Sequence, residues 1–267
     1  MHILLTGGHS GIGLELSKLL LAEGHHLGLI LRNSNRQADA EAELGKDAAV
    51  DYFFADLSMR DEVEGVANQV ASKWDHVDGL YNNAGVLLDQ AYYSPQGYEM
   101  HMEVNTLTPY YLTRALAPLL SKAEKPFVIN TATGGLHSQK KIDIPNLRKP
   151  VKFVKLLGSY RFSKFAMVLL MNHLAKEMPS LRVLSVDPGP NKTKMTQGGG
   201  MPKWLLPLRN LFFPPATKGA SLMYKAAFEP TFQQISGQYI SGNKVKPLAY
   251  AFSEAEVEEL LAPVPAS

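Results

Sequence analysis

The stretch Thr6-Gly7-Gly8-His9-Ser10-Gly11-Ile12-Gly13 joins an apolar run at residues 3–5 to a helically spaced segment at residues 14–20. Gly7 permits a tight bend, Gly11 lets the backbone approach a pyrophosphate, and Gly13 allows a helix to pack closely on a strand. The free N–H groups and the positive dipole end of that helix would face the phosphates. An ordinary strand–helix turn is the alternative. The position at the start of a strand–helix–strand unit favours a dinucleotide site that includes Ser10 and Ile12, while His9 either contacts phosphate or is solvated.

Short apolar runs alternate with amphipathic segments along the chain. The runs show no polar alternation, which is typical of strands buried on both faces. Helices between such strands imply right-handed crossovers and a parallel, doubly wound sheet. Seven strands are predicted, at residues 3–5, 27–31, 50–54, 79–81, 127–129, 183–186 and 238–240.

The composition narrows the class of protein. Lys and Arg number 27 against 25 Asp and Glu, and the net charge of +2 gives no support to a nucleic-acid partner. A hydrophobic fraction of 45% excludes global disorder, and the absence of cysteine excludes disulfides, iron–sulfur clusters and thiol catalysis. The eight histidines are scattered, so we predict no metal site. No apolar run approaches the roughly 20 residues of a membrane span, and we expect a cytoplasmic protein.

The end of the second predicted strand bears on which dinucleotide is bound. An NAD site places an acid there, about 20 residues after the glycines, to hold the ribose 2′-hydroxyl. This chain has Arg32 instead, with no acid before Asp39. A guanidinium pairs with a 2′-phosphate, which a carboxylate would repel. We therefore predict NADP(H) rather than NAD(H); the alternative is that Arg32 is a solvated surface residue.

Tyr160 and Lys164 open a strongly helical stretch that runs to about residue 178. Side chains four residues apart share one helical face, so the two groups can converge. A free tyrosine has a pKa of about 10, and a nearby ammonium lowers it by favouring the phenolate. Such a pair can give a proton to an alkoxide or accept one from an alcohol. The spacing alone is common by chance, and the alternative is a core tyrosine beside a surface lysine.

The motifs together are more specific than any one of them. Asn82-Asn83-Ala84-Gly85 follows the fourth strand, and Pro188-Gly189 follows the sixth. With the glycine turn and the Tyr160–Lys164 pair, this order resembles the short-chain dehydrogenase/reductase family from Thr6 to about Gly242. The long segment before Tyr160 and the Ser236-Gly237-Gln238-Tyr239 end resemble its retinol-dehydrogenase-like branch. The resemblance implies a single Rossmann-like α/β domain over residues 1–267, with a mostly parallel seven-stranded sheet and helices on both faces.

The resemblance also implies roles position by position. Tyr160 would be the general acid/base, and Lys164 would lower its pKa and bind the nicotinamide ribose. Asn105 would hold a water in the proton relay, and nearby Pro109 fits a helix irregularity there. The remaining matched residues would contact the cofactor: Asp56 and Leu57 at the adenine, Asn83, Ala84 and Gly85 on the adenosine side, and Pro188, Gly189 and Thr193 at the nicotinamide.

One position departs from the family pattern. The family usually has a serine at the end of the fifth strand, where this chain reads Asn130-Thr131-Ala132-Thr133. Aligning on the strand puts Thr133 at that position. Threonine keeps the hydroxyl that would hydrogen-bond a substrate carbonyl, but it adds a methyl group and a stiffer χ1. The alternatives are that Ser138 takes the role, or that Thr133 is a plain strand-end threonine.

Two stretches, residues 136–158 and 194–215, interrupt the strand–helix rhythm, and we predict loop insertions at both. The second is rich in large apolar side chains, and Gly198-Gly199-Gly200 would serve as its hinge. In the family this stretch covers the nicotinamide, so an apolar lid implies a lipophilic carbonyl or alcohol substrate. The alternative for this stretch is an oligomer interface or a peripheral membrane-surface patch, supported by the basic residues between 140 and 155.

The expected function is NADP-dependent reduction of a lipophilic aldehyde or ketone, or the reverse oxidation of an alcohol, with Tyr160 moving the proton. The alternative is an NADP(H)-binding regulator or scaffold of the same fold that has lost catalysis, which Thr133 leaves open. Relatives often form homodimers or homotetramers through the helix that begins at Tyr160.

Overall fold

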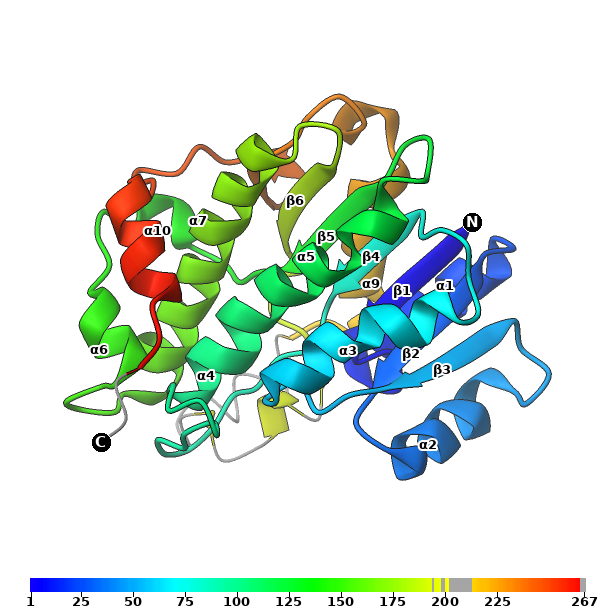
Figure 1. The fold of residues 1–267 in the computed structure, drawn as a ribbon, viewed down its shortest axis with the longest axis horizontal. Coiled ribbons are helices and arrows are strands. Elements are labelled where there is room, and N and C mark those ends of the chain that lie inside the picture. Colours follow the sequence, from blue (N-terminus) through cyan, green and yellow to red (C-terminus); the bar gives the residue numbers. More distant parts are fainter. Residues whose placement is uncertain (194, 198–199, 202–212, 265–267) are drawn as a thin grey trace.

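The protein is built on one eight-stranded sheet, seen in a computed structural model that describes residues 1–193, 195–197, 200–201 and 213–264 (Figure 1). The strand order is β3-β2-β1-β4-β5-β6-β7-β8, and every neighbouring pair is parallel except β7 and β8. The chain order reverses at β1, which lies between β2 and β4. The strands are β1 (His2–Thr6), β2 (His26–Leu31), β3 (Val50–Phe54), β4 (Gly79–Asn82), β5 (Phe127–Thr131), β6 (Arg182–Asp187), β7 (Gln238–Ser241) and β8 (Lys244–Val245).

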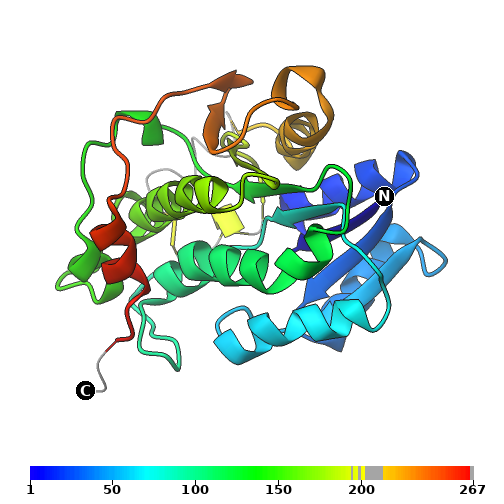
Figure 2. The same ribbon diagram turned by 45° about the horizontal axis from the view of Figure 1, so that its top comes forward.

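Helices cover both faces of the sheet (Figures 1 and 2). One layer contains α3 (Arg60–Ala71), α5 (Thr108–Leu120) and α7 (Arg161–Glu177). The other contains α1 (Gly11–Ala22), α2 (Ser34–Leu44) and α9 (Ala216–Phe228). The predicted doubly wound, mostly parallel α/β fold is therefore confirmed.

Alternate residues of each strand pack into opposite layers, which explains the unbroken apolar runs. Leu4 and Leu80 pack with the helices of the α3–α5–α7 layer. Ile3 and Leu5 pack with those of the α1–α2–α9 layer. All four side chains are fully buried, so these strands are covered on both faces.

Two details differ from the sequence expectation. The sheet has an eighth strand, because a turn at Gly242 and Asn243, both with φ of 59°, folds the two-residue β8 back along β7. Both residues of β8 are exposed, so this strand has no hydrophobic pattern to predict it. Residues 136–158 are not a loop throughout, since they include a short helix, α6 (Ile144–Arg148).

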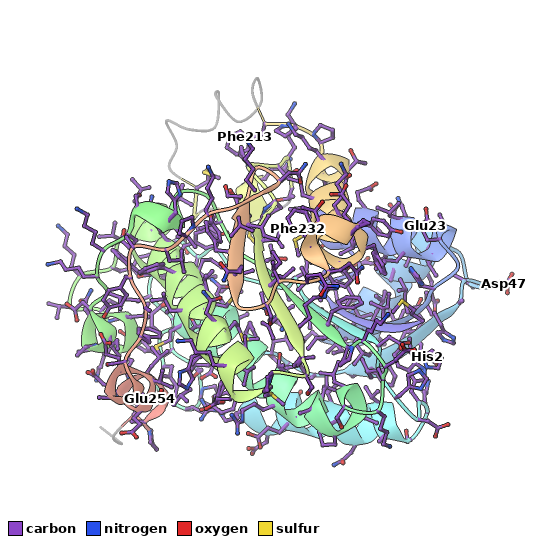
Figure 3. All side chains as sticks on the ribbon, turned by 90° about the horizontal axis from the view of Figure 1, so that it is seen from above. His2, Glu23, Asp47, Phe213, Phe232 and Glu254 are labelled. Carbon is purple, nitrogen blue, oxygen red and sulfur yellow. The ribbon has the colours of Figure 1, made fainter. Side chains whose placement is uncertain are left out.

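The remaining elements lie at one end of the molecule. The helix α4 (Met100–Met102) runs into a π-helical turn at Glu103–Leu107 before α5, at the irregularity predicted near Pro109. A second π-helical segment, Lys155–Tyr160, leads into α7. The C-terminal helix α10 (Glu254–Leu261) packs beside α6, and its Glu254 lies at the opposite end of the molecule from Asp47 (Figure 3).

Among the described helices, none combines the length and the apolar character needed to cross a bilayer. The carboxyl ends of β1 to β6 meet at one edge of the sheet. In doubly wound folds, the crevice outside these ends, at the point where the strand order reverses, is where ligands bind.

Candidate active site

A cleft of about 760 Å³ opens along the carboxyl ends of the strands, within the size range of small-molecule sites. It brings together most of the residues that the sequence predicted. Those that line it are Gly7, His9, Ser10, Gly11, Ile12, Arg32, Leu57, Asn83, Ala84, Gly85, Thr133, Tyr160, Lys164, Pro188, Gly189 and Thr193. Gly13, Asp56 and Asn105 do not line it.

The glycine turn has the geometry that its sequence predicted. Gly7 and Gly11 have φ of +70° and +56°, in the left-handed region that side chains rarely adopt. A Cβ at Gly13 would lie 2.2 Å from the carbonyl oxygen of Gly7, so only glycine lets α1 pack this close to the turn. The side chain of Ser10 precedes α1 without capping it, which leaves the first N–H groups of the helix facing the cleft.

The second strand ends in a charge pair rather than a lone arginine. Arg32 Nε lies 3.3 Å from Asp56 Oδ2, and the Arg32 side chain is 62% exposed. Burial raises the pKa of Asp56, but hydrogen bonds from Ser58 and the charge of Arg32 outweigh it and hold that pKa below its ordinary value. Arg36, which the sequence analysis missed, also lines this end of the cleft from the first turn of α2.

The Asn83–Gly85 segment is held to the first strand by the side chain of Thr6. Thr6 Oγ1 accepts hydrogen bonds from the backbone N–H groups of Asn83 and Ala84, both at 3.0 Å. A Cβ at Gly85 would lie 2.9 Å from Asn105 Oδ1 and 3.3 Å from Lys164 Nζ, so glycine is required at that position. The segment therefore braces β1 against β4.

Asn105 lies in the π-helical turn behind this wall and is fully buried. Its Oδ1 accepts from the N–H of Val86 at 2.8 Å, and its Nδ2 donates to Val86 O and to Ser163 Oγ, both at 3.1 Å. These bonds tie the cleft wall to α7. The role of Asn105 in a proton relay stays a prediction.

Tyr160, Lys164 and Thr133 all line the cleft, the first two at the start of α7. Lys164 is 3% exposed, and its Nζ donates to the carbonyl oxygen of Thr131 at 2.7 Å. The Thr133 hydroxyl hydrogen-bonds the Tyr160 phenol. The Thr133 carbonyl is itself held by Tyr239 Oη at 2.7 Å, which fixes the backbone beneath that hydroxyl. Ser138 does not line the cleft, and its Oγ donates to Gly135 O.

The pKa of Tyr160 is shifted in the opposite direction to the one predicted from the sequence. Burial raises the pKa of Tyr160 to about 12, with Asp187 adding to the increase and the Thr133 hydrogen bond opposing it. Burial lowers the pKa of Lys164 to about 8. The predicted lowering of the Tyr160 pKa by Lys164 is therefore wrong for this structure, because desolvation dominates. Tyr160 is held as a neutral phenol, the form that donates a proton.

Asp187, at the end of β6, is a second residue that the sequence analysis missed. It is 8% exposed and lines the cleft on the Tyr160 side. Its carboxylate accepts from the N–H of Gly189 at 2.9 Å and from Ser241 Oγ at 2.8 Å. The only sequence signal is its place directly before Pro188 and Gly189. It fixes the turn predicted to contact the nicotinamide.

The predicted lid, residues 194–215, is described in part. Met195, Met201 and Phe213 line the cleft. The remaining apolar residues of that stretch and two of the three hinge glycines lie outside the described residues: Gly198, Gly199, Trp204, Leu205, Leu206, Leu208, Leu211 and Phe212. Across the described residues, no group of three or more His, Asp or Glu side chains is arranged to hold a metal ion.

The fold and this cleft define a class of protein that comparison with known proteins identifies. A family model described as short chain dehydrogenase matches residues 1–141. The chain therefore belongs to the short-chain dehydrogenase family and is an oxidoreductase acting between CH–OH and C=O groups.

Individual relatives support the predicted branch. Retinol dehydrogenase 11 of Mus musculus is 27% identical over 252 residues, covering 92% of this chain and 79% of the relative. Polyprenol dehydrogenase of Danio rerio is 26% identical over 269 residues, covering 94% and 81%. The retinol-dehydrogenase-like placement is confirmed.

Solved structures show the same fold. A short chain dehydrogenase/reductase family protein has a TM-score of 0.68 at 28% identity, covering 90% of this chain and 94% of the other. The Pseudomonas aeruginosa RhlG/NADP active-site complex has a TM-score of 0.71 at 24% identity, covering 91% and 94%.

Proposed function

We propose that the chain is an NADP(H)-dependent reductase of lipophilic aldehydes or ketones, which also runs the reverse oxidation. The observation that carries this proposal is that Tyr160, Thr133 and Lys164 line the same cleft as the glycine turn. Fold alone does not specify an activity. A phenol, a hydroxyl and an ammonium along one cleft are the groups that proton transfer at a carbonyl oxygen requires.

The residues present fit a dinucleotide bound along the strand ends. Gly11 and Ile12 at the start of α1 line the cleft, and the helix N-terminus that the Ser10 side chain does not cap suits a pyrophosphate. Arg32 and Arg36 at the adenosine end supply two guanidinium groups for a 2′-phosphate. When bound, the nicotinamide supplies or accepts the hydride.

The protein's own residues handle the proton. Tyr160, neutral because burial raises its pKa to about 12, donates the proton to the developing alkoxide oxygen. The Thr133 hydroxyl stabilises that oxygen and orients the phenol. A tyrosine that stays protonated at neutral pH is in the form that the reductive step requires.

The described walls of the substrate end are apolar. Leu87, Leu88, Leu156 and Met201 line the cleft together with Phe213. Apolar walls around a few polar groups bind apolar ligands whose carbonyl meets those groups. A lipophilic aldehyde or ketone fits this description, and a cytoplasmic location stays a prediction.

The test follows NADPH absorbance with a panel of apolar aldehydes, ketones and quinones. Wild-type protein should turn over at least one class, and Tyr160→Phe should lower kcat by about 10²–10⁴-fold with little change in NADPH affinity. Retained turnover in Tyr160→Phe would remove the mechanism. Tight NADPH binding with no turnover across the panel would instead support the regulator alternative.

A further inference from the structure

The charge of this protein is concentrated in one segment. Residues 136–158 contain six Lys and Arg against one acid, which leaves 21 bases and 24 acids in the rest of the chain. Four lysines of this segment are exposed and form no ion pair with the part of the chain that the structure describes. They are Lys140, Lys141, Lys149 and Lys152. A chain that is nearly neutral overall therefore carries its main excess of positive charge in this one segment.

Large apolar side chains are interleaved with these lysines. Val151 is 96% exposed, Leu157 is 63% exposed and Val154 is 45% exposed. Single exposed apolar residues are ordinary on a monomer. Three of them within seven residues, alternating with lysines, form a combined apolar and basic surface, which is the composition that favours binding at a membrane interface.

Two inward-pointing side chains, Arg148 and Phe153, hold the backbone of this segment against the rest of the protein. Arg148 points inward, and its guanidinium donates to the carbonyl oxygens of Glu259, Ala262 and Pro263. Phe153 stacks on the buried ring of His101, with ring centroids 5.8 Å apart. Between these two inward contacts, Lys149, Val151 and Lys152 are exposed. The segment directly follows α6, which packs beside α10 (Figure 1).

The surface borders the mouth of the cleft. Leu156 and Leu157 line the cleft, four and three residues before Tyr160. Leu157 is thus part of the exposed apolar surface and of the cleft wall at once. An apolar ligand held at this surface would therefore lie next to the cleft.

We infer that residues 140–157 dock on the surface of an anionic lipid bilayer. Val151, Val154 and Leu157 enter the boundary between headgroups and acyl chains, and the four exposed lysines lie near the anionic headgroups. Each lysine near such a surface contributes about fivefold to binding. Exposed valines and a leucine interleaved with lysines have the composition that favours a lipid interface over an acidic protein. Only the delivery of a lipophilic substrate rests on the proposed function; the binding does not.

The test is co-sedimentation of the full chain with phosphatidylcholine vesicles, with and without phosphatidylserine, at low and high salt. We expect binding to the anionic vesicles only, and a loss of at least about tenfold in affinity at high salt, because screening acts on exposed charges. Replacing Lys140, Lys141, Lys149 and Lys152 with Gln should weaken binding by about 100-fold or more. Val151→Ser combined with Val154→Ser should weaken it with all lysines present.

A matched control removes four exposed lysines elsewhere, at Lys46, Lys122, Lys125 and Lys244, and should leave vesicle binding unchanged. Equal loss in the control, no sedimentation of wild-type protein, or binding to soluble polyglutamate in place of vesicles would overturn the inference. Turnover of a water-soluble short aldehyde should be the same in the four-lysine variant as in wild type. Vesicle binding by a chain with no turnover on any carbonyl would overturn the proposed function and leave this inference standing.

Discussion

His101 Nδ1 lies 2.8 Å from Glu99 Oε1, and neither residue has any exposed surface. The other ring nitrogen, Nε2, accepts a hydrogen bond from the backbone N–H of Leu88 at 3.0 Å. An imidazole that accepts at Nε2 and faces a carboxylate at Nδ1 carries its proton on Nδ1. The edge of the ring lies against Tyr160, with centroids 6.3 Å apart. One buried pair therefore positions a wall of the cleft and contacts Tyr160, the proposed proton donor.

Replacing His101 tests this positioning role. His101→Phe keeps a ring against Tyr160 but removes the bonds to Glu99 and Leu88, so we expect a loss of about 1–3 kcal/mol in unfolding free energy. The Leu88 wall should loosen, which would raise KM for the carbonyl substrate more than it lowers kcat. His101→Gln offers an amide oxygen to the Leu88 N–H and should recover part of the KM. Equal KM in wild type and both variants would show that the pair serves stability alone.

Thr133 provides a test of the departure from the family's serine. Thr133→Val has the same shape but no hydroxyl, and we expect kcat to fall by about 10²–10³-fold. The backbone should stay in place, because Tyr239 holds the Thr133 carbonyl. Thr133→Ser should retain activity. Turnover by Thr133→Val at the wild-type rate would show that this hydroxyl is not used.

Lys164 makes stability depend on pH. Its pKa is about 8 in the folded protein against 10.5 ordinarily, so the unfolded chain binds its proton more tightly. Burying the charged form costs stability below about pH 8, and this cost disappears as the pH rises towards about 10.5. The two pKa values correspond to about 3 kcal/mol. Urea unfolding should show wild type gaining stability over this range relative to Lys164→Met, and a constant difference between them would contradict the assignment.

Asp187 should influence the same tyrosine. Asp187→Asn removes a negative charge that raises the Tyr160 pKa, so the pH optimum for alcohol oxidation should move to lower pH. Asparagine can still accept from the Gly189 N–H. Ser241→Ala removes one partner of the carboxylate and keeps its charge, and it should leave the pH optimum in place. The pH profiles of kcat for both variants decide between a charge effect and a structural one.

Much of the fold was predictable because its signals are local. The glycine turn, Asn83–Gly85 and Pro188–Gly189 each directly follow a strand, and parallel strands bring their carboxyl ends to one edge. The sequence therefore indicated which residues line the cleft, although these residues are far apart along the chain.

The remaining features depend on contacts that no local pattern reveals. Asp187 bonds Ser241, 54 residues away, and neither residue type is unusual at the end of a strand. The upward shift of the Tyr160 pKa follows from the depth at which the phenol is buried. The spacing of Tyr160 and Lys164 in the sequence does not reveal that depth. The helix α6 is five residues long, too short for a helical period to be visible in the sequence.

The arginines at the adenosine end of the cleft allow the proposed preference for NADPH over NADH to be tested. Arg32→Leu and Arg36→Leu should each lower kcat/KM for NADPH by about 10–100-fold, because each removes a charged hydrogen bond to a 2′-phosphate, and should leave NADH almost unaffected. Arg114→Leu is the matched control, since Arg114 is similarly exposed but pairs with Glu177 on α7.

Replacing Asp56 tests the same cofactor preference with the opposite expected effect. If NADPH is the cofactor, Asp56→Asn releases Arg32 from its ion pair and removes a carboxylate near the phosphate, so kcat/KM for NADPH should rise a few-fold. If Asp56 instead holds a ribose 2′-hydroxyl, Asp56→Asn will lower kcat/KM for NADH and spare NADPH. The ratio of the two cofactor efficiencies before and after this one substitution assigns the cofactor. It needs no knowledge of the natural substrate, since any carbonyl that the protein reduces will report it.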